Sequence, residues 1–215
     1  MEFKTMKPQE KSRGSAFGTS YHVCYSRKMG RQITVFSNLC FDRIIMHEMN
    51  HAVESYCERP FSDSCYINGK KVLIEPDIAV EYSNGDTLFE WMRYEASETS
   101  SIEDRISSWS HQTGSKVRIL RPEDVYSGKY LMRNLHLLAA RSRRVSPGSK
   151  TDDKLILYYL KENTEITIGK LYEKGLLSRS DGMSYISDLY YRGKITIPKI
   201  ADESISYRTE VVANA

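Results

Sequence analysis

The sequence lacks a long apolar run and has only a small excess of positive charge. No hydrophobic segment approaches the roughly 20 residues that a membrane-spanning helix needs, and the first residues, MEFKTMKPQEKSRGS, have no apolar core like that of a secretory signal. The formal net charge is +3 over 215 residues, so overall electrostatics does not indicate a nucleic-acid partner. We expect a cytoplasmic protein without a membrane partner.

Cysteine is also scarce. The cysteines at 24, 40, 57 and 65 form no C-x-x-C pair, and nothing else in the sequence indicates an oxidising compartment, so we expect reduced thiols. The composition is 40% hydrophobic and 27% charged, which is ordinary for a globular protein. The length allows one large domain, or a medium domain followed by a small one.

The stretch RIIMHEMNHAVESY contains the pattern H-E-x-x-H at residues 47–51. Two histidines four residues apart share a helix face, where they can hold Zn²⁺ with the glutamate as general base, as in zinc metallopeptidases. No recognisable third-ligand motif follows, and a proline and a strand come soon after His51, which puts this histidine at the helix end. We therefore expect no zinc and keep an HExxH metallopeptidase as a distant alternative.

The chain alternates between helix and strand patterns. Residues 1–20 are polar and basic, which predicts an arm or a flexible start. An α/β domain over 21–140 follows, because strand-like alternation and hairpin turns at Asn68-Gly69 and Asn84-Gly85 lie between helix patterns. Its expected elements are a helix over 38–51 with Ser37 as N-cap, strands over 62–67, 71–82 and 87–94, a helix over 98–112, a strand over 116–120 and a helix through LMRNLHLLAARS.

The segment RSRRVSPGSKTDD is basic, polar and turn-rich, which predicts a linker over 141–150. Beyond it, residues 151–215 show three amphipathic helix patterns followed by two strands. This order is typical of a winged helix, a variant of the helix-turn-helix. We therefore expect a winged-helix-like C-terminal domain.

Two acidic residues have a spacing typical of nucleases. Asp77 follows Pro76, and Glu90 lies on the next strand. In the PD-(D/E)xK nuclease fold, an Asp at a strand bend and a Glu on the next strand hold Mg²⁺, while a Lys two residues later activates the attacking water. Position 92 faces the same side as position 90, but Met92 can neither hold a proton nor polarise water.

The segment from Ser37 to Glu95 resembles the N-terminal nuclease domain of the TnsA-like endonucleases, the endonuclease subunits of heteromeric bacterial transposases. That family has a Ser-x-Leu-Glu helix start, a Leu-Glu-Phe-Asp-Pro-x-Val-x-x-Tyr-x-x-Gln-Pro passage, a Gly-Lys turn, Pro-Asp-Phe-x-Val and Glu/Gln-x-Lys. The matching stretches here are SNLC (37–40), HEMNHAVESYCERP (47–60), GK (69–70), PDIAV (76–80) and EWM (90–92).

The resemblance implies a restriction-endonuclease-like (PD-(D/E)xK) α/β core with a C-terminal winged-helix-like domain. It makes Asp77 the metal-binding Asp and Glu90 the second strand ligand. Cys40 stands where the family has an active-site Glu, and Met92 stands where it has a Lys. Mg²⁺ is the cofactor that the family implies, but its site is incomplete here, with two carboxylates and no cationic group for the scissile phosphate.

The leading interpretation is a DNA-binding, catalytically impaired TnsA-like protein in a complex for transposition, recombination or another DNA transaction of a phage or mobile element. An active, divergent Mg²⁺-dependent DNA endonuclease is the alternative. DNA and other transposition or mobile-element proteins are the expected partners, and the oligomeric state stays open.

Basic and polar residues near the linker and in the third C-terminal helix are the candidate DNA contacts. Acidic residues near the same surface leave a protein-binding role for the winged-helix-like domain equally open. The candidates are Arg141, Arg143, Arg144, Lys150, Ser184, Tyr185, Ser187, Tyr191, Arg192 and Lys194.

Overall fold

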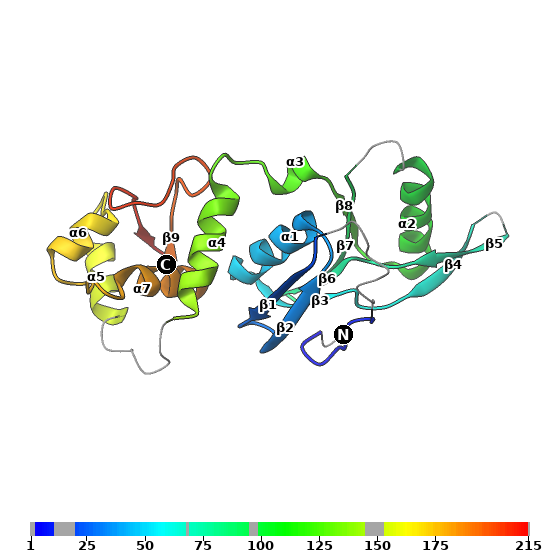
Figure 1. Cartoon of the computed structure of the whole chain (residues 1–215), viewed down its shortest axis with the longest axis horizontal. Coiled ribbons are helices and arrows are strands. Elements are labelled where there is room, and N and C mark those ends of the chain that lie inside the picture. The colour runs from blue at the N-terminus through cyan, green and yellow to red at the C-terminus, as the bar shows by residue number, and fades with distance from the viewer. Residues whose placement is uncertain (1–2, 11–19, 68, 95–98, 145–152, 215) are drawn as a thin grey trace. The chain divides into compact units, whose positions relative to one another are not determined.

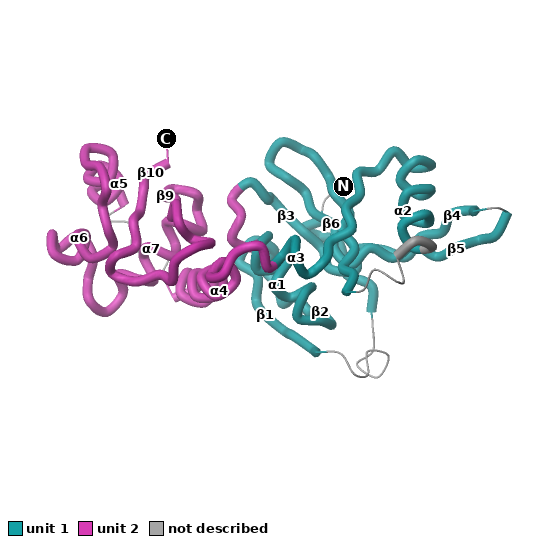
Figure 2. Tube along the Cα trace, turned by 90° about the horizontal axis from the view of Figure 1, so that it is seen from above, with its two compact units in different colours: residues 1–47, 52–125 teal, residues 48–51, 126–215 magenta. Residues whose placement is uncertain are grey.

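The computed structural model describes residues 3–10, 20–67, 69–94, 99–144 and 153–214. The chain divides into two compact units (Figure 2). Unit 1 comprises residues 1–47 and 52–125, and unit 2 comprises residues 48–51 and 126–215. Within the described residues, no helix is long and apolar enough to cross a membrane.

Unit 1 is built on a four-stranded mixed sheet in the order β3-β6-β7-β8 (Figure 1). The strands β3, β6 and β7 are antiparallel, whereas β8 is parallel to β7. A parallel neighbour requires a crossover connection, and the helix α2 supplies it. The bounds are β3 Val53–Glu58, β6 Ile78–Tyr82, β7 Thr87–Met92, α2 Thr99–Thr113 and β8 Val117–Leu120.

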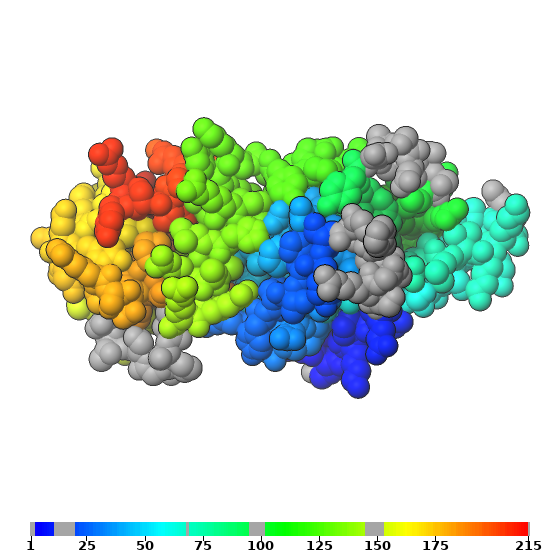
Figure 3. Space-filling view, in the orientation of Figure 1, coloured from blue at the N-terminus to red at the C-terminus, as the bar shows by residue number. Residues whose placement is uncertain are grey.

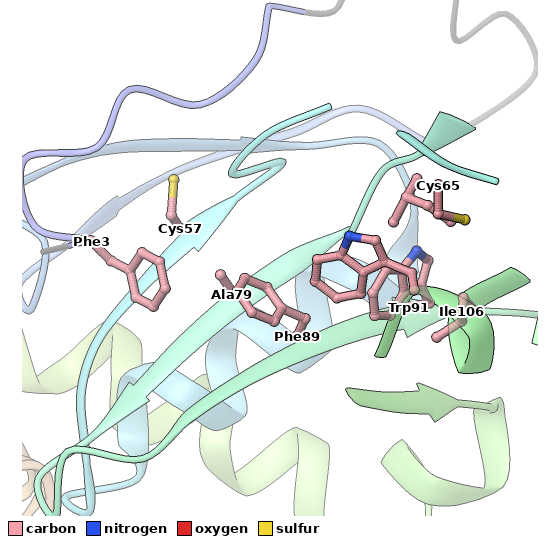
Figure 4. Packing of buried hydrophobic residues seen from close by; sticks show 9 residues of the cluster. Phe3, Cys57, Cys65, Ala79, Phe89, Trp91 and Ile106 are labelled. Carbon is pink, nitrogen blue, oxygen red and sulfur yellow. The ribbon is translucent and has the colours of Figure 1, made fainter. Parts of the chain in front are cut away.

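Alternation along the strands sends side chains to both faces of this sheet. On one face, Ala79, Phe89 and Trp91 pack with Ile106 and Trp109 of α2 in a buried cluster (Figure 4). The opposite face lies against α1, Asn38–Met49, whose side chains reach β7. Both faces are therefore covered, which explains why β6 and β7 read as almost continuous apolar runs.

The first residues of the chain differ from the expected flexible arm. Phe3 is completely buried and meets Phe89 edge to face, with ring centroids 6.4 Å apart. The backbone N–H of Gln9 donates to the carbonyl of Arg59 at 2.8 Å. Burial of Phe3, which stabilises by about 2 kcal/mol, and the backbone contact of Gln9 both hold residues 3–10 on unit 1.

Two hairpins flank the sheet. One consists of β1 (His22–Ser26) and β2 (Arg31–Val35), and the other of β4 (Asp63–Ile67) and β5 (Lys70–Ile74). A single strand over 71–82 is therefore wrong, because β5 and β6 belong to different sheets. Pro76 lies in the break, where its missing N–H prevents continued pairing.

Unit 2 contains α5 (Asp153–Glu162), α6 (Ile168–Glu173) and α7 (Gly182–Tyr191), followed by the short strands β9 (Ile195–Thr196) and β10 (Val212–Ala213). The two strands pair antiparallel. The expected order of three helices and a β-ribbon is confirmed. Thr167 forms an additional bridge with Glu210, which holds the start of α6 to the segment before β10.

The helix α4, Leu131–Ser142, belongs to unit 2 and packs closely on α7. Its amide Asn134 donates to the carbonyl oxygens of Ile200 and Glu203 at 2.8 and 2.7 Å. In Figure 3 the red loop of the C-terminal segment lies directly against the yellow-green α4. The structural boundary after Val125 thus differs from the expected one at 140, because the face of α4 that predicted a buried helix is buried in unit 2. The short helix α3, Pro122–Val125, ends unit 1.

Candidate functional site

The two predicted acids lie side by side at one end of β6 and β7. The N–H of Asp77 donates to the carbonyl of Glu90 at 2.9 Å. In return, Asp77 Oδ2 accepts a hydrogen bond from the N–H of Met92 at 2.7 Å. These contacts extend the antiparallel register of the two strands by one step beyond Ile78, which pairs with Glu90. The sequence spacing predicted this proximity.

Glu90 is completely buried, and both oxygens of its carboxylate are engaged by α1. Arg43 binds it as a fork, with Nε 3.0 Å from Oε2 and Nη2 2.5 Å from Oε1. His47 Nε2 lies 2.7 Å from Oε2. Arg43 and His47 are four residues apart, so successive turns of α1 present both side chains to the same carboxylate.

Opposing effects set the protonation of this cluster. Burial alone would raise the pKa of Glu90, but the interactions with His47 and Arg43 outweigh it and lower the pKa to about 2. Burial lowers the pKa of His47, and the neighbouring Glu90 carboxylate offsets only part of this effect. At neutral pH the cluster is therefore a compensated pair of Arg43 cation and Glu90 anion, with a neutral imidazole beside it.

Cys40 and Met92 are both buried near these acids, at 7% and 6% exposure. Burial raises the pKa of the Cys40 thiol well above its usual value, and the charges of Asp77 and Glu90 raise it further. The thiol is therefore neutral, and a neutral thiol is a poor ligand for a hard cation. Ser37 Oγ accepts from the N–H of Cys40 at 3.1 Å, which confirms Ser37 as the cap of α1.

Asp77 also has a cationic partner. Arg93 Nη1 lies 3.2 Å from Asp77 Oδ2, and the same guanidinium donates to the Met92 carbonyl at 2.6 Å. The N–H of Arg59 donates to the carbonyl of Asp77 at 2.8 Å. The Asp77 side chain keeps 35% exposure, so it is the more accessible of the two acids.

These residues do not fit a Mg²⁺ ion in the observed arrangement. A magnesium site needs carboxylate oxygens free to bind in near-octahedral geometry, whereas both oxygens of Glu90 are bound by Arg43 and His47. Across the described ranges, no group of three or more His, Cys, Asp or Glu side chains is placed to hold a metal ion. Arg43 supplies the positive charge beside Glu90 that a bound metal ion would otherwise supply.

The H-E-x-x-H pattern is divided by the end of the helix. His47 lies on α1 and bonds to Glu90, whereas α1 ends at Met49 and His51 lies in the following turn, exposed. The shared helix face that a zinc metallopeptidase requires is therefore not formed. His47 instead forms a hydrogen bond with the Glu90 carboxylate on β7.

Most candidate DNA contacts on α7 are committed to the fold. Ser184 and Ser187 are buried, and Ser187 Oγ donates to the Met183 carbonyl at 2.6 Å. In this packing neither serine side chain is exposed for a contact with DNA, and α7 packs against α4. Tyr191 is half-buried.

Tyr185 and Arg192 share one carboxylate, that of Asp153 on α5. The Tyr185 hydroxyl donates to Asp153 Oδ1 at 2.6 Å, and Arg192 Nη1 lies 2.6 Å from Oδ2. Arg192 Nε binds Asp188 as well, at 2.7 Å. The spacing of Arg192 and Asp188 by four residues is a signal for this second pair.

The remaining basic candidates have different positions. Lys194 is exposed just before β9, Arg143 and Arg144 are exposed after the end of α4, and Arg141 lines a cleft in unit 2. Lys150 lies outside the described residues. These arginines and Lys194 are therefore better placed for an external partner than the α7 candidates.

Sequence reasoning missed Arg43, Arg93 and Asn134. Arg43 follows Cys40 by three residues and precedes His47 by four, which places all three on one helix face. That spacing was the available signal for a cation directed at the acids. The chain matches no protein-family model and no curated protein sequence.

Proposed function

We propose that this chain is a DNA-binding protein with a restriction-endonuclease-like domain of the TnsA-like type, whose nuclease centre is impaired. Support comes from the element order of α1, three antiparallel strands, α2 and a parallel strand, and from the closeness of Asp77 and Glu90. The observation that carries the impaired centre is the capture of both Glu90 oxygens by Arg43 and His47. The proposed protein would act in a DNA transaction such as transposition.

In this proposal the chain binds DNA through its fold and charge, without cutting it. Asp77 and Glu90 retain the positions of metal ligands, but their charges are compensated by arginines from the same unit. The loss of the lysine at position 92 removes the group that would activate water. Unit 2, with its three helices and β-ribbon, serves as the winged-helix-like partner domain.

Two measurements test the proposal. Fluorescence anisotropy with a 30-base-pair duplex in a salt series should give binding that weakens as salt rises, because counterions are released from phosphates. A plasmid-nicking assay with Mg²⁺ and Mn²⁺ should give no metal-dependent cutting. Absence of duplex binding at all salt concentrations would overturn the DNA-binding part. Metal-dependent cutting that is lost in Asp77→Ala would instead support the active endonuclease.

A further inference from the structure

Unit 2 presents one aromatic ring to solvent from a fixed loop. Tyr207, in the loop between β9 and β10, is 67% exposed. The backbone beneath it is ordered, because its carbonyl accepts from the N–H of Gly169 at 2.7 Å. The ring rests edge to face on Tyr172, with centroids 5.3 Å apart. This contact holds one edge of Tyr207 and leaves the rest of the ring accessible to a ligand.

The backbone around Tyr207 is closely fitted. A Cβ atom at Gly169 would lie 2.9 Å from the Tyr207 carbonyl oxygen, so glycine permits the approach of α6 to the loop. Ser206 N–H donates to Thr209 Oγ1 at 2.8 Å, and Thr209 N–H donates back to the Ser206 carbonyl at 3.1 Å. Preorganisation of this kind lowers the entropy that a ligand must offset.

Tyr207 lines two clefts of unit 2, and each contains one arginine. The first, of about 240 Å³, is lined by Arg141 of α4 together with Ile168 and Met183. The second, of about 410 Å³, is lined by Arg179, Glu173 and Tyr172. Within the described parts of the chain, neither guanidinium has an ion-pair or hydrogen-bond partner. Both guanidinium groups can therefore bind an anion. The two linings contain one acidic residue, Glu173, beside these two arginines.

An accessible ring that shares one cleft with Arg141 and another with Arg179 suits the alternation of base and phosphate in a nucleic-acid strand. Unpaired bases stack on aromatic side chains, and arginines neutralise the flanking phosphates. Bases of a duplex are already stacked on each other, so the ring selects a single strand. The apolar wall of the first cleft gives room for a neighbouring base or sugar. An acidic peptide would use the cations, but it does not require a stacking surface.

We propose that Tyr207, Arg141 and Arg179 form a binding site for single-stranded DNA. The site deepens the proposed DNA association and rests on it for the choice of DNA. It lies wholly within unit 2 and uses none of the residues of the Asp77–Glu90 site. Its ligand contacts are stacking on Tyr207 and phosphate binding by the two arginines, so it tolerates any base sequence.

The test is fluorescence anisotropy of the full chain with a fluorescein-labelled 12-nucleotide thymidine strand at 50 to 200 mM salt. Tyr207→Ala should weaken binding about 5- to 150-fold, the range of losses found for one stacked base, whereas Tyr207→Phe should retain it. Arg141→Gln and Arg179→Gln should each make the salt dependence shallower by about 0.7 in log–log slope. Tyr158→Ala is the matched control, because Tyr158 is 65% exposed on α5 and lines neither cleft.

Any one of five results would overturn the site. One is a wild-type chain that binds the duplex but not the single strand, which leaves the proposed function standing. Another is an equal effect of Tyr207→Ala and Tyr158→Ala. The third is retention of single-strand affinity in the arginine double variant. If a Glu- and Phe-containing peptide binds at the same residues while the strand does not, the site is a peptide site. If neither the strand nor the duplex binds, both proposals fail together.

Discussion

Arg43 of α1 holds Glu90 of β7 through two hydrogen bonds inside unit 1, and the carboxylate that they bind is completely buried. The pair joins the helix to the sheet across 47 positions of sequence. His47 completes the arrangement from the next turn of α1. The contacts of Arg43 and His47 with Glu90 stabilise unit 1, and they also occupy the carboxylate oxygens that a metal ion would need.

The buried ion pair of Arg43 and Glu90 predicts a large loss of stability for Arg43→Ala. The substitution leaves the buried Glu90 carboxylate without its cationic partner, so the free energy of unfolding should fall by about 3–5 kcal/mol. Both tryptophans of the chain, Trp91 and Trp109, are buried in unit 1. Tryptophan fluorescence during urea unfolding therefore reports this unit alone.

The control for Arg43→Ala is Lys116→Ala. Lys116 pairs with Asp86 at 2.6 Å on the surface, and its side chain is 64% exposed. Its removal should change the free energy of unfolding by less than about 1 kcal/mol. The double variant Arg43→Met with Glu90→Leu should recover most of the stability, because it removes both buried charges. A decrease under about 1 kcal/mol in Arg43→Ala would contradict a compensated pair.

Acid should destabilise unit 1 through Glu90. Its pKa is lowered from the usual 4.5 to about 2 in the folded chain. Between these values the unfolded chain binds more protons, so stability is present above pH 4.5 and is lost as the pH falls towards 2. The expected decrease is about 3 kcal/mol, from about 1.4 kcal/mol per pH unit. Urea unfolding followed by tryptophan fluorescence at pH 5, 4, 3 and 2 measures it.

Glu90→Gln is the informative comparison for this acid dependence. The amide does not titrate, so the variant should be less stable at neutral pH but should show a flatter decline below pH 4.5. The lowered pKa of His47 acts in the same direction, because the unfolded chain takes up its proton first as the pH falls. An identical pH profile for the wild type and Glu90→Gln would rule out Glu90 as the source.

Local patterns predicted most elements but not their partners. The helix at Asn38, the hairpin turn at Gly85 and the three C-terminal helices each follow from signals within a few residues. The pairing of Arg43 with Glu90 depends on a contact between a helix and a distant strand, which no local pattern encodes. Phe3 is similar, since a single apolar residue in a polar segment has no periodicity.

The displaced domain boundary has the same cause. The amphipathic pattern of α4 predicts that one face is buried, but it does not say against which unit. The basic, turn-rich segment after Arg141 was the stronger local signal for a boundary. Asn134 and the loop that it binds are 66 or more positions apart, so the contact that fixes α4 in unit 2 is also non-local.

Asn134→Ala should loosen the loop before β10. Asn134 is buried and satisfies the carbonyls of Ile200 and Glu203 and the N–H of Ile205. Its removal leaves three backbone groups without their partner, and should cost unit 2 about 2–4 kcal/mol. Hydrogen exchange measured by mass spectrometry should show faster exchange over residues 199–206.

The matched control is Asn163→Ala, an exposed asparagine whose amide donates to the Tyr159 carbonyl at 2.8 Å. Water replaces that hydrogen bond, so the change in stability should remain within about 0.5 kcal/mol. If both asparagine variants leave exchange over residues 199–206 unchanged, Asn134 does not hold the loop.

Arg192→Ala separates a structural role from a DNA-binding role. Arg192 binds Asp153 and Asp188 within unit 2, and its removal leaves two partly buried carboxylates without their cation. The free energy of unfolding of unit 2 should fall by about 1–2 kcal/mol, measured by hydrogen exchange of α5 and α7. Duplex affinity should change less than about twofold, because the guanidinium is committed to the fold.

By contrast, Arg143→Ala with Arg144→Ala should reduce the salt dependence of duplex binding by about 0.9 for each phosphate that the variant no longer neutralises. If Arg192→Ala leaves the stability of unit 2 unchanged but abolishes duplex binding, the prediction is wrong and α7 acts as a recognition helix.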